Sequence, residues 1–295
     1  MVHEIEAKKL LITNKHPSSW FGVKYYLNIY RGCMHGCIYC DTRSECYNID
    51  NFDSDISVKI NTIELLRKEL SSKRYRETIG FGSASDAYVP IEKKYELTKK
   101  SLEVIKELRF PLFLLTKSNL VLRDAEIISE INKQNYACVA FTITTTDDNL
   151  AKIIEPHAPL PSERLKAMSI LAMLGIKTGI VIMPTLPYIT DTEENIVDIV
   201  RQAKQHDASF VFPSFSVTLR DRQRDYFYDH IDEDIKNKYI NRYKNYYSCT
   251  SPDYKKLKIA FINACREYNM SSEMPSYAKD SSVTQLSFFK DNNDE

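Results

Sequence analysis

The sequence has no excess of either charge sign. Its 295 residues include 40 Lys and Arg against 40 Asp and Glu, which excludes a generally polycationic nucleic-acid coat protein. It also lacks an apolar run near the ~20 residues of a membrane-spanning helix, and its N-terminus lacks the apolar segment of a signal peptide. Hydrophobic residues make up 43% of the chain, which is ordinary for a globular protein. We therefore expect a cytoplasmic, globular protein without a membrane segment.

The sequence also lacks an even number of cysteines spread along the chain. The chain has seven cysteines, and four of them fall within one short stretch: Cys33, Cys37, Cys40 and Cys46. This crowding is a poor disulfide framework but is typical of a metal or cluster site. We expect reduced cysteines.

Short continuous apolar segments alternate with amphipathic helical patterns from residue 25 onward. Six segments lack polar alternation, as strands buried on both faces of a parallel sheet do; they are residues 25–30, 78–82, 112–116, 137–144, 179–183 and 209–213. The repeated βα order predicts a parallel sheet with right-handed crossovers, either an open doubly wound sheet or a partial barrel. Small and polar residues follow nearly every segment at once, which marks the active face of either architecture.

Cys33, Cys37 and Cys40 form a CxxxCxxC motif just after the first of these strands. Three thiolates on a tight loop can hold three irons of a cubane cluster and leave a fourth iron open. The alternative is structural zinc, with Cys46 or His35 as the fourth ligand. Zinc modules usually bring their ligands as two pairs separated by a spacer and do not need six βα units, so the spacing favours a cluster.

At this point the sequence resembles the radical SAM superfamily. In that superfamily a three-cysteine loop follows the first strand of a partial (β/α)6 barrel and carries an aromatic residue before the third cysteine, here Tyr39. More narrowly, residues 25–216 are similar to the spore photoproduct lyase-like group, often labelled DNA repair photolyases. The similarity rests on YRGCMHGCIYCD around the cysteines, GFGSASDAYVPIE and LLTKS after the second and third strands, and EPHAPLPSERLKAM ahead of the fourth helix.

The resemblance implies an α/β protein, a radical SAM partial (β/α)6 TIM-type barrel with a helical C-terminal extension. We expect an N-terminal segment, a radical SAM core, a helical extension and a flexible tail, at residues 1–24, 25–216, 217–270 and 271–295. The implied enzyme binds a [4Fe-4S] cluster and S-adenosylmethionine (SAM), and cleaves SAM reductively to a 5'-deoxyadenosyl radical. Its implied substrate is nucleic acid, in a DNA repair-like lyase reaction, with an external one-electron reductant of the flavodoxin or ferredoxin type.

The resemblance also implies residue roles. Cys33, Cys37 and Cys40 would ligate the cluster. Tyr39 would lie against the adenosyl group of SAM, Ser85 and Lys117 would bind its methionyl end or its sugar, and Thr142 would face the ribose. Lys117 follows a buried strand, where an ammonium needs an anionic partner, and the alternative partner is Asp86 or Glu92. Glu155 and Arg164 are expected to pair and to fix the proline-rich turn between them.

Two departures from the family pattern concern the substrate chemistry. In spore photoproduct lyase a cysteine stands where Ser83 aligns and returns a hydrogen atom, and a tyrosine stands where Asp41 aligns. An alcohol O–H bond is too strong to replace a thiol, so Cys46 or Cys249 is the candidate hydrogen-atom donor unless both are merely small packing residues. The alternatives are a radical SAM enzyme acting on a peptide, RNA or metabolite, and a zinc-stabilised interaction protein without SAM turnover.

Two C-terminal features suggest partners. A basic, tyrosine-rich stretch over residues 236–247 combines cations for phosphates with rings for bases, or else packs its tyrosines on the barrel. Near the end, residues 285–289 (QLSFF) resemble the pentapeptide by which bacterial replication and repair proteins bind the sliding clamp. An apolar peptide in a terminal tail suits a groove, and the alternative is that Gln285–Phe289 folds back onto the barrel.

Overall fold

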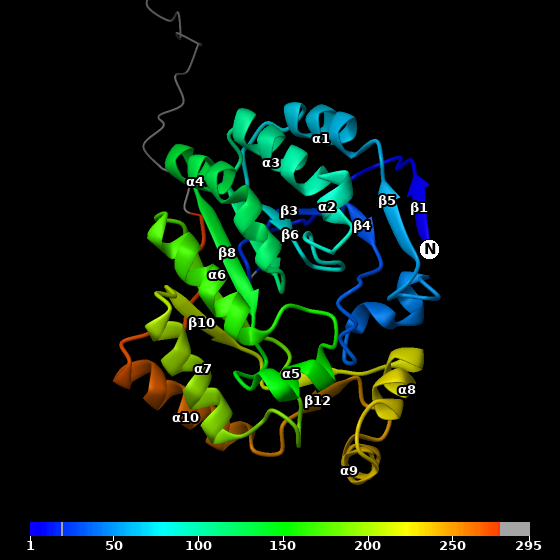
Figure 1. Ribbon diagram of the computed structural model, residues 1–295, viewed down its shortest axis with the longest axis vertical. Coiled ribbons are helices and arrows are strands. Elements are labelled where there is room, and N and C mark those ends of the chain that lie inside the picture. Colours follow the sequence, from blue (N-terminus) through cyan, green and yellow to red (C-terminus); the bar gives the residue numbers. More distant parts are fainter. Residues whose placement is uncertain (19, 278–295) are drawn as a thin grey trace, which may run out of the picture.

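The computed structural model describes residues 1–18 and 20–277 (Figure 1). At its centre is a sheet of seven strands in the order β10-β9-β8-β7-β6-β3-β2. Six of them run parallel: β3 (Tyr25–Leu27), β6 (Ile79–Phe81), β7 (Leu112–Thr116), β8 (Ala137–Thr142), β9 (Lys177–Ile182) and β10 (Phe210–Pro213). The six parallel strands follow one another in chain order from β3 to β10, without the reversal of order that defines a doubly wound sheet, so the sheet is the expected partial (β/α)6 barrel.

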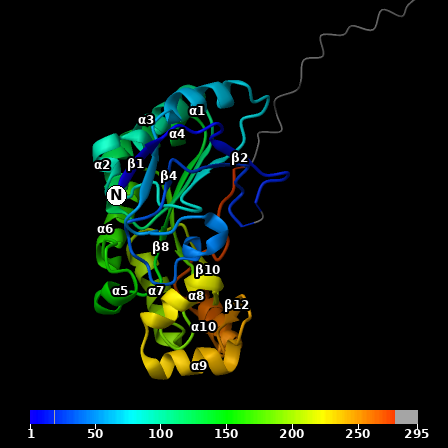
Figure 2. The ribbon, with the colours of Figure 1, turned by 90° about the vertical axis from the view of Figure 1, so that its right-hand side faces the viewer.

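Helices follow the strands and cover one face of the sheet (Figures 1 and 2). Their bounds are α1 (Thr62–Ser71), α2 (Glu92–Tyr95), α3 (Leu97–Glu107), α4 (Ala125–Gln134), α5 (Asp148–Ile154), α6 (Pro161–Met173) and α7 (Glu193–Gln205), with a 3-10 helix η3 (Asn119–Asp124). Helix α7 illustrates why the sequence forms these helices where it does. The Thr192 side chain accepts from the Asn195 N–H at its start, and buried residues at helical spacing, Ile196 and Ile199 among them, face the core.

The opposite face of the sheet is filled from both ends of the chain. Because side chains alternate along a strand, Phe113 of β7 and Cys138 of β8 point away from the helices and form a second apolar cluster. Val23, which is fully buried, packs into that cluster, and its side chain occupies the space that a Cβ at Gly80 would need. Figure 2 shows this N-terminal segment on the side of the sheet opposite α6. The packing closes part of the face and leaves the C-terminal strand ends open.

Three short N-terminal strands lie outside the six segments that the sequence predicts, and the predicted strand 25–30 is interrupted at residues 28 and 29. β2 (Leu11–Thr13) pairs antiparallel with β3, and β1 (Val2–Ile5), β5 (Ile56–Lys59) and β4 (Tyr30–Arg31) form a small separate sheet in the order β1-β5-β4. Each has only two to four residues. Such strands are too short for a periodic pattern to reveal.

The C-terminal part combines a two-stranded ribbon with helices. β11 (Ser216–Thr218) pairs antiparallel with β12 (Ser248–Thr250), and the helices are α8 (Asp221–Asp229), α9 (Glu233–Tyr243) and α10 (Tyr254–Glu267). Within the basic stretch, Tyr239 and Tyr243 are buried against Phe227, whereas Tyr246 and Tyr247 are 69% and 46% exposed. The packing alternative therefore holds for the first two tyrosines. None of the helices in the described ranges combines the length and the apolarity needed to cross a bilayer.

Candidate functional site

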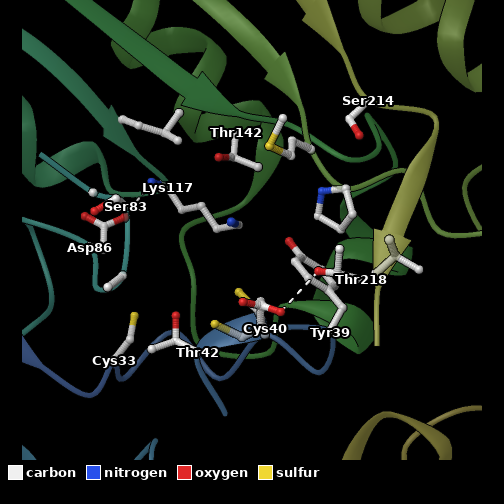
Figure 3. Close-up of a pocket in the computed structure, with 18 of the residues that line it drawn as sticks. Cys33, Tyr39, Cys40, Thr42, Ser83, Asp86, Lys117, Thr142, Ser214 and Thr218 are labelled. Carbon is white, nitrogen blue, oxygen red and sulfur yellow. Dashed lines mark hydrogen bonds between the residues drawn. The ribbon is translucent and has the colours of Figure 1, made fainter. Parts of the chain in front are cut away.

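A cavity of about 730 Å³ opens at the C-terminal ends of the parallel strands. The loop that carries the cysteine motif forms one wall, and the segments that follow β6, β7, β8, β9 and β10 form the others (Figure 3). The cavity is lined by all seven residues expected to bind the cluster or SAM: Cys33, Cys37, Cys40, Tyr39, Ser85, Lys117 and Thr142. Strand position explains part of this, because Leu115 lies near the C-terminal end of β7 and Lys117 is the first residue after that strand.

The cysteine loop lies between β4 and two 3-10 helices, η1 (Asp41–Arg43) and η2 (Glu45–Tyr47). It turns sharply at Gly36, which has a φ of +71° and would place a Cβ 2.9 Å from the His157 ring. Glycine alone meets both demands. The Cys33 N–H donates to the Phe52 carbonyl at 3.0 Å and fixes the start of the loop.

The thiols fit a cluster better than a single metal ion. In the part of the chain that the structure describes, no three Cys, His, Asp or Glu side chains converge on one ion, as the zinc alternative would require. The three thiols instead share one cavity, where a larger group could accept all of them. Burial raises the pKa of Cys37 to about 12, although Lys117 opposes the rise. A cationic iron centre is what would hold such thiols as thiolates.

Three buried residues hold the cysteine loop in place, and we call them the inner support: Tyr39, Glu155 and Arg164. The Tyr39 hydroxyl donates to the Glu155 carboxylate, and Nη2 of Arg164 donates to Oε2 of Glu155 at 2.5 Å. Arg164 also donates to the carbonyls of Thr142 and Pro159, at 2.9 and 2.7 Å. Burial raises the pKa of Glu155, but the charges of Arg164 and Lys117 outweigh it and keep the pKa below its usual value. The expected Glu155–Arg164 pair is confirmed.

Asp86 is a second carboxylate in the cavity wall. It accepts from the Thr116 hydroxyl at 2.7 Å and from the backbone N–H groups of Lys117 and Tyr88, both at 2.8 Å. Nε2 of His35 lies 3.3 Å from its Oδ2, although neither ring nitrogen of His35 makes a hydrogen bond to any residue that the structure describes. Burial raises the pKa of Asp86, but His35 and the two N–H groups lower it further, to about 2. Asp86 is therefore charged and orders the loop after β7.

The Lys117 ammonium extends into the cavity without an ion-pair partner among the described residues (Figure 3). Asp86 binds its backbone N–H, and Glu92 pairs with Arg123 at 2.6 Å, so neither alternative partner neutralises the ammonium. Its Nζ lies 5.6 Å from the Tyr39 ring centroid. Burial lowers the pKa of Lys117, but Cys37 and Glu155 raise it more, so the group stays charged. The cavity thus presents a free cation to an anionic ligand.

A second set of contacts, here called the outer support, joins the cysteine loop to the C-terminal part. Asp41 accepts from Nη2 of Arg220 at 2.8 Å, from the Thr218 hydroxyl at 3.2 Å and from the hydroxyls of Tyr47 and Tyr247 at 3.2 and 3.3 Å. Asp41 and Arg220 are 30% and 32% exposed. The sequence reasoning missed Arg220, and no local pattern could have found it, because it lies 179 residues from Asp41.

The two expected hydrogen-atom donors lie elsewhere. Cys46 is exposed and its Sγ accepts from the Ser44 hydroxyl at 3.3 Å. Cys249 is fully buried in the cluster of Phe227 and Tyr239, and its burial raises the pKa of the thiol to about 11. Neither is among the described residues that line the cavity, whereas Ser83 is. The structure does not bring the two thiols to the cysteine loop's cavity, and a donor role for either stays a prediction.

Comparison with known proteins places the chain in a family. It is 38% identical over 192 residues to an uncharacterized protein of Methanocaldococcus jannaschii, spanning 64% of this chain and 70% of that one. It is 31% identical over 232 residues to an uncharacterized protein of Mycobacterium tuberculosis, spanning 76% and 67%. A radical SAM Nalpha-GlyT isomerase of Pseudomonas phage M6 is 26% identical over 162 residues, spanning 55% and 33%.

Solved structures share the fold. Spore photoproduct lyase complexed with dinucleoside spore photoproduct superposes with a TM-score of 0.67 at 17% identity, covering 90% of this chain and 79% of that one. A mutant of the same lyase with bound AdoMet has a TM-score of 0.66. A family model described as "Radical SAM superfamily" matches residues 27–203, more than half of the chain. The chain therefore belongs to the radical SAM superfamily, whose enzymes use a [4Fe-4S] cluster and S-adenosylmethionine.

Proposed function

We propose that this radical SAM enzyme cleaves SAM reductively and acts on nucleic acid in a lyase-type reaction related to DNA repair. One observation carries the first half: three thiols, two of them buried, share a cavity with the Lys117 ammonium, which has no ion-pair partner among the described residues. The second half is supported by the shared fold with spore photoproduct lyase, whose solved structure holds a dinucleoside spore photoproduct.

Each residue of the cavity has a defined task in this proposal. Cys33, Cys37 and Cys40 would hold the cluster, and the Lys117 ammonium would bind the carboxylate of SAM, an anion that suits a cation without an ion-pair partner. The Tyr39 ring, fixed by its bond to Glu155, packs against the adenosyl group. When bound and reduced by one electron, the cluster and SAM supply hydrogen-atom abstraction. Ser85 and Thr142, both buried in the wall, provide hydroxyls for the rest of SAM.

The test begins with the cofactors. After anaerobic reconstitution, Cys37→Ala is expected to lose the cluster and all SAM cleavage. Lys117→Met should retain iron and sulfide but bind SAM about 10- to 100-fold more weakly, as loss of a charge-assisted hydrogen bond predicts. Lys166→Met, on the exposed face of α6, is the matched control. A normal cluster with full cleavage in Cys37→Ala would refute the cofactor assignment.

The substrate class needs a separate assay. Reduced enzyme with SAM is incubated with irradiated DNA, undamaged DNA, RNA or a peptide mixture, and 5'-deoxyadenosine is quantified. DNA-dependent formation above the substrate-free rate supports the proposal. Formation that depends on the peptide mixture alone would move the enzyme to the alternative class while leaving its cofactors unchanged.

We also propose that the tail binds a bacterial sliding clamp. Its motif, Gln285–Phe289, lies outside the described residues, and the proposal rests on its sequence, with Leu286 and Phe289 as the apolar anchors. Fluorescence titration of the isolated tail peptide with clamp should saturate, and a Leu286→Ala, Phe289→Ala peptide should not. Absence of saturation at high micromolar clamp would remove the proposal.

A further inference from the structure

Trp20, the only tryptophan of the chain, lines the same cavity as the cysteine motif. Its ring is backed by Phe212 and Phe21, at centroid distances of 6.0 and 6.3 Å, and Phe21 is itself stacked on Phe113 at 5.2 Å and 19°. Despite this support Trp20 is 52% exposed. A large ring anchored on one side and exposed in a concave site has the properties of a recognition surface.

The cavity wall after β10 offers hydroxyl groups, and the charged residues of the described lining are Lys117, Asp41 and Asp86. Ser214 and Ser216 follow β10, and their hydroxyl oxygens lie 3.2 Å apart. Both line the cavity, as does Ser248 of the neighbouring β12. Among the described lining residues, Lys117 is the one lysine or arginine. An aromatic face with nearby hydroxyls suits a neutral planar ring with a hydrogen-bonding edge better than it suits a phosphate.

Tyr247 is the other half-exposed ring in the lining, but it is already engaged. Its hydroxyl donates to Asp41 at 3.3 Å, and the Arg220 guanidinium lies 5.0 Å from its ring centroid. Tyr39 is buried and donates to Glu155. Trp20 is therefore the ring best placed to accept a planar ligand.

We propose that Trp20 stacks on one unpaired nucleobase of the substrate, while the hydroxyls of Ser214 and Ser216 bind the edge of that base. The inference rests on the proposed function and narrows it. The base alone enters the cavity, and its sugar–phosphate backbone stays outside. The phosphates therefore do not occupy Lys117, which is left for SAM. Enzymes that act on a base inside a duplex must extrude it first. Single-stranded nucleic acid is accordingly bound more readily than duplex.

The single tryptophan makes a direct test possible. Reconstituted enzyme is titrated with oligothymidylate, with oligouridylate and with an abasic oligomer of equal length, and Trp20 fluorescence and the anisotropy of labelled oligomer are recorded. We expect saturable quenching by the two base-containing oligomers and weak, non-quenching binding of the abasic one. Trp20→Ala should weaken oligothymidylate binding about 10- to 100-fold, Trp20→Phe should restore much of the affinity, and Ser216→Ala should weaken it less than Trp20→Ala.

Ile12→Ala, which truncates another exposed apolar side chain away from the cavity, is the matched control and should bind like wild type. The SAM dissociation constant should be unchanged in Trp20→Ala. Equal oligomer affinities of wild type and Trp20→Ala, or equal quenching by the abasic oligomer, would overturn the stacking inference and leave the proposed function standing. Failure of wild type to bind any oligomer would overturn both. Quenching by one of the two oligomers alone supports stacking and assigns its source to DNA or to RNA.

Discussion

Two of the carboxylate–arginine pairs around the cysteine loop, Glu155–Arg164 and Asp41–Arg220, differ chiefly in burial. In the inner support the side chains of Arg164 and Glu155 are 1% and 0% exposed, whereas in the outer support Arg220 and Asp41 are 32% and 30% exposed. Both pairs are short, at 2.5 and 2.8 Å. Loss of the arginine should therefore cost more stability in the inner pair, because water can replace a lost partner only in the exposed outer pair.

The arginine of the inner pair is also the more completely bonded, because Arg164 donates to Glu155 and to two carbonyls, whereas Nε of Arg220 has no hydrogen-bond partner among the described residues. Glu155 accepts from Tyr39, Arg164 and, at 3.3 Å, the Thr144 hydroxyl, so its charge is matched within the protein. The same turn adds two backbone bonds to the cysteine loop, from the Ile38 N–H to the Ile154 carbonyl at 3.0 Å and from the His157 N–H to the His35 carbonyl at 3.1 Å. A cofactor loop that must not shift is thus fixed by buried bonds, and the exposed pair only adds to them.

The largest expected effect comes from breaking the inner pair. Arg164→Met leaves the Glu155 carboxylate buried without its main partner, which should lower the free energy of unfolding by about 3–5 kcal/mol. Urea unfolding of the cluster-free protein measures it, and Arg201→Met, in an exposed pair with Asp198 on α7, is the control. Adding Glu155→Gln to Arg164→Met should recover part of the loss. A loss below about 1 kcal/mol would mean that burial does not distinguish the two supports.

A smaller effect concerns Asp86, the buried carboxylate of the cavity wall. Its pKa of about 2 lies below its usual value of 3.8, so its charged form stabilises the fold above about pH 4 and that contribution disappears as the pH falls toward 2. The shift corresponds to roughly 2 kcal/mol. Asp86→Asn should therefore be less stable than wild type at pH 6, and the difference should shrink on acidification.

Unfolding of the cluster-free proteins between pH 6 and pH 2.5 would test the Asp86 prediction, with the exposed Glu194→Gln as control. A gap between wild type and Asp86→Asn that stays constant over this range would assign the effect to lost hydrogen bonds rather than to charge.

The sequence predicted the barrel well because its strands are buried on both faces. Leu112–Thr116 was found with its observed bounds, and Ala137–Thr142 was predicted two residues too long. Two strands of the small N-terminal sheet, Val2–Ile5 and Ile56–Lys59, were missed, because segments this short have no clear periodicity and pair only with partners distant in sequence. Its third strand, Tyr30–Arg31, was predicted as the end of strand 25–30.

The candidate site was predictable only where one loop or one strand end defines it. The cysteine spacing identified Cys37 as a ligand, and the family resemblance added Lys117 and Thr142; the structure brings all three to one cavity. Trp20 and Arg220 were missed, because each reaches the site through tertiary packing across the chain. Local patterns therefore locate a cofactor loop more readily than the residues around it.

The smallest effect is expected from the outer pair. Arg220→Ala should lower the free energy of unfolding by less than about 1 kcal/mol, since Asp41 keeps three hydroxyl donors and remains partly hydrated. The loss should shrink further at high salt, because exposed charges are screened, while cluster content and SAM cleavage stay at wild-type levels. The free energy of unfolding of Arg220→Lys should lie between those of wild type and Arg220→Ala. If Arg220→Ala instead unfolds as easily as Arg164→Met, or releases iron, the loop depends on both sides equally, and the distinction by burial is lost.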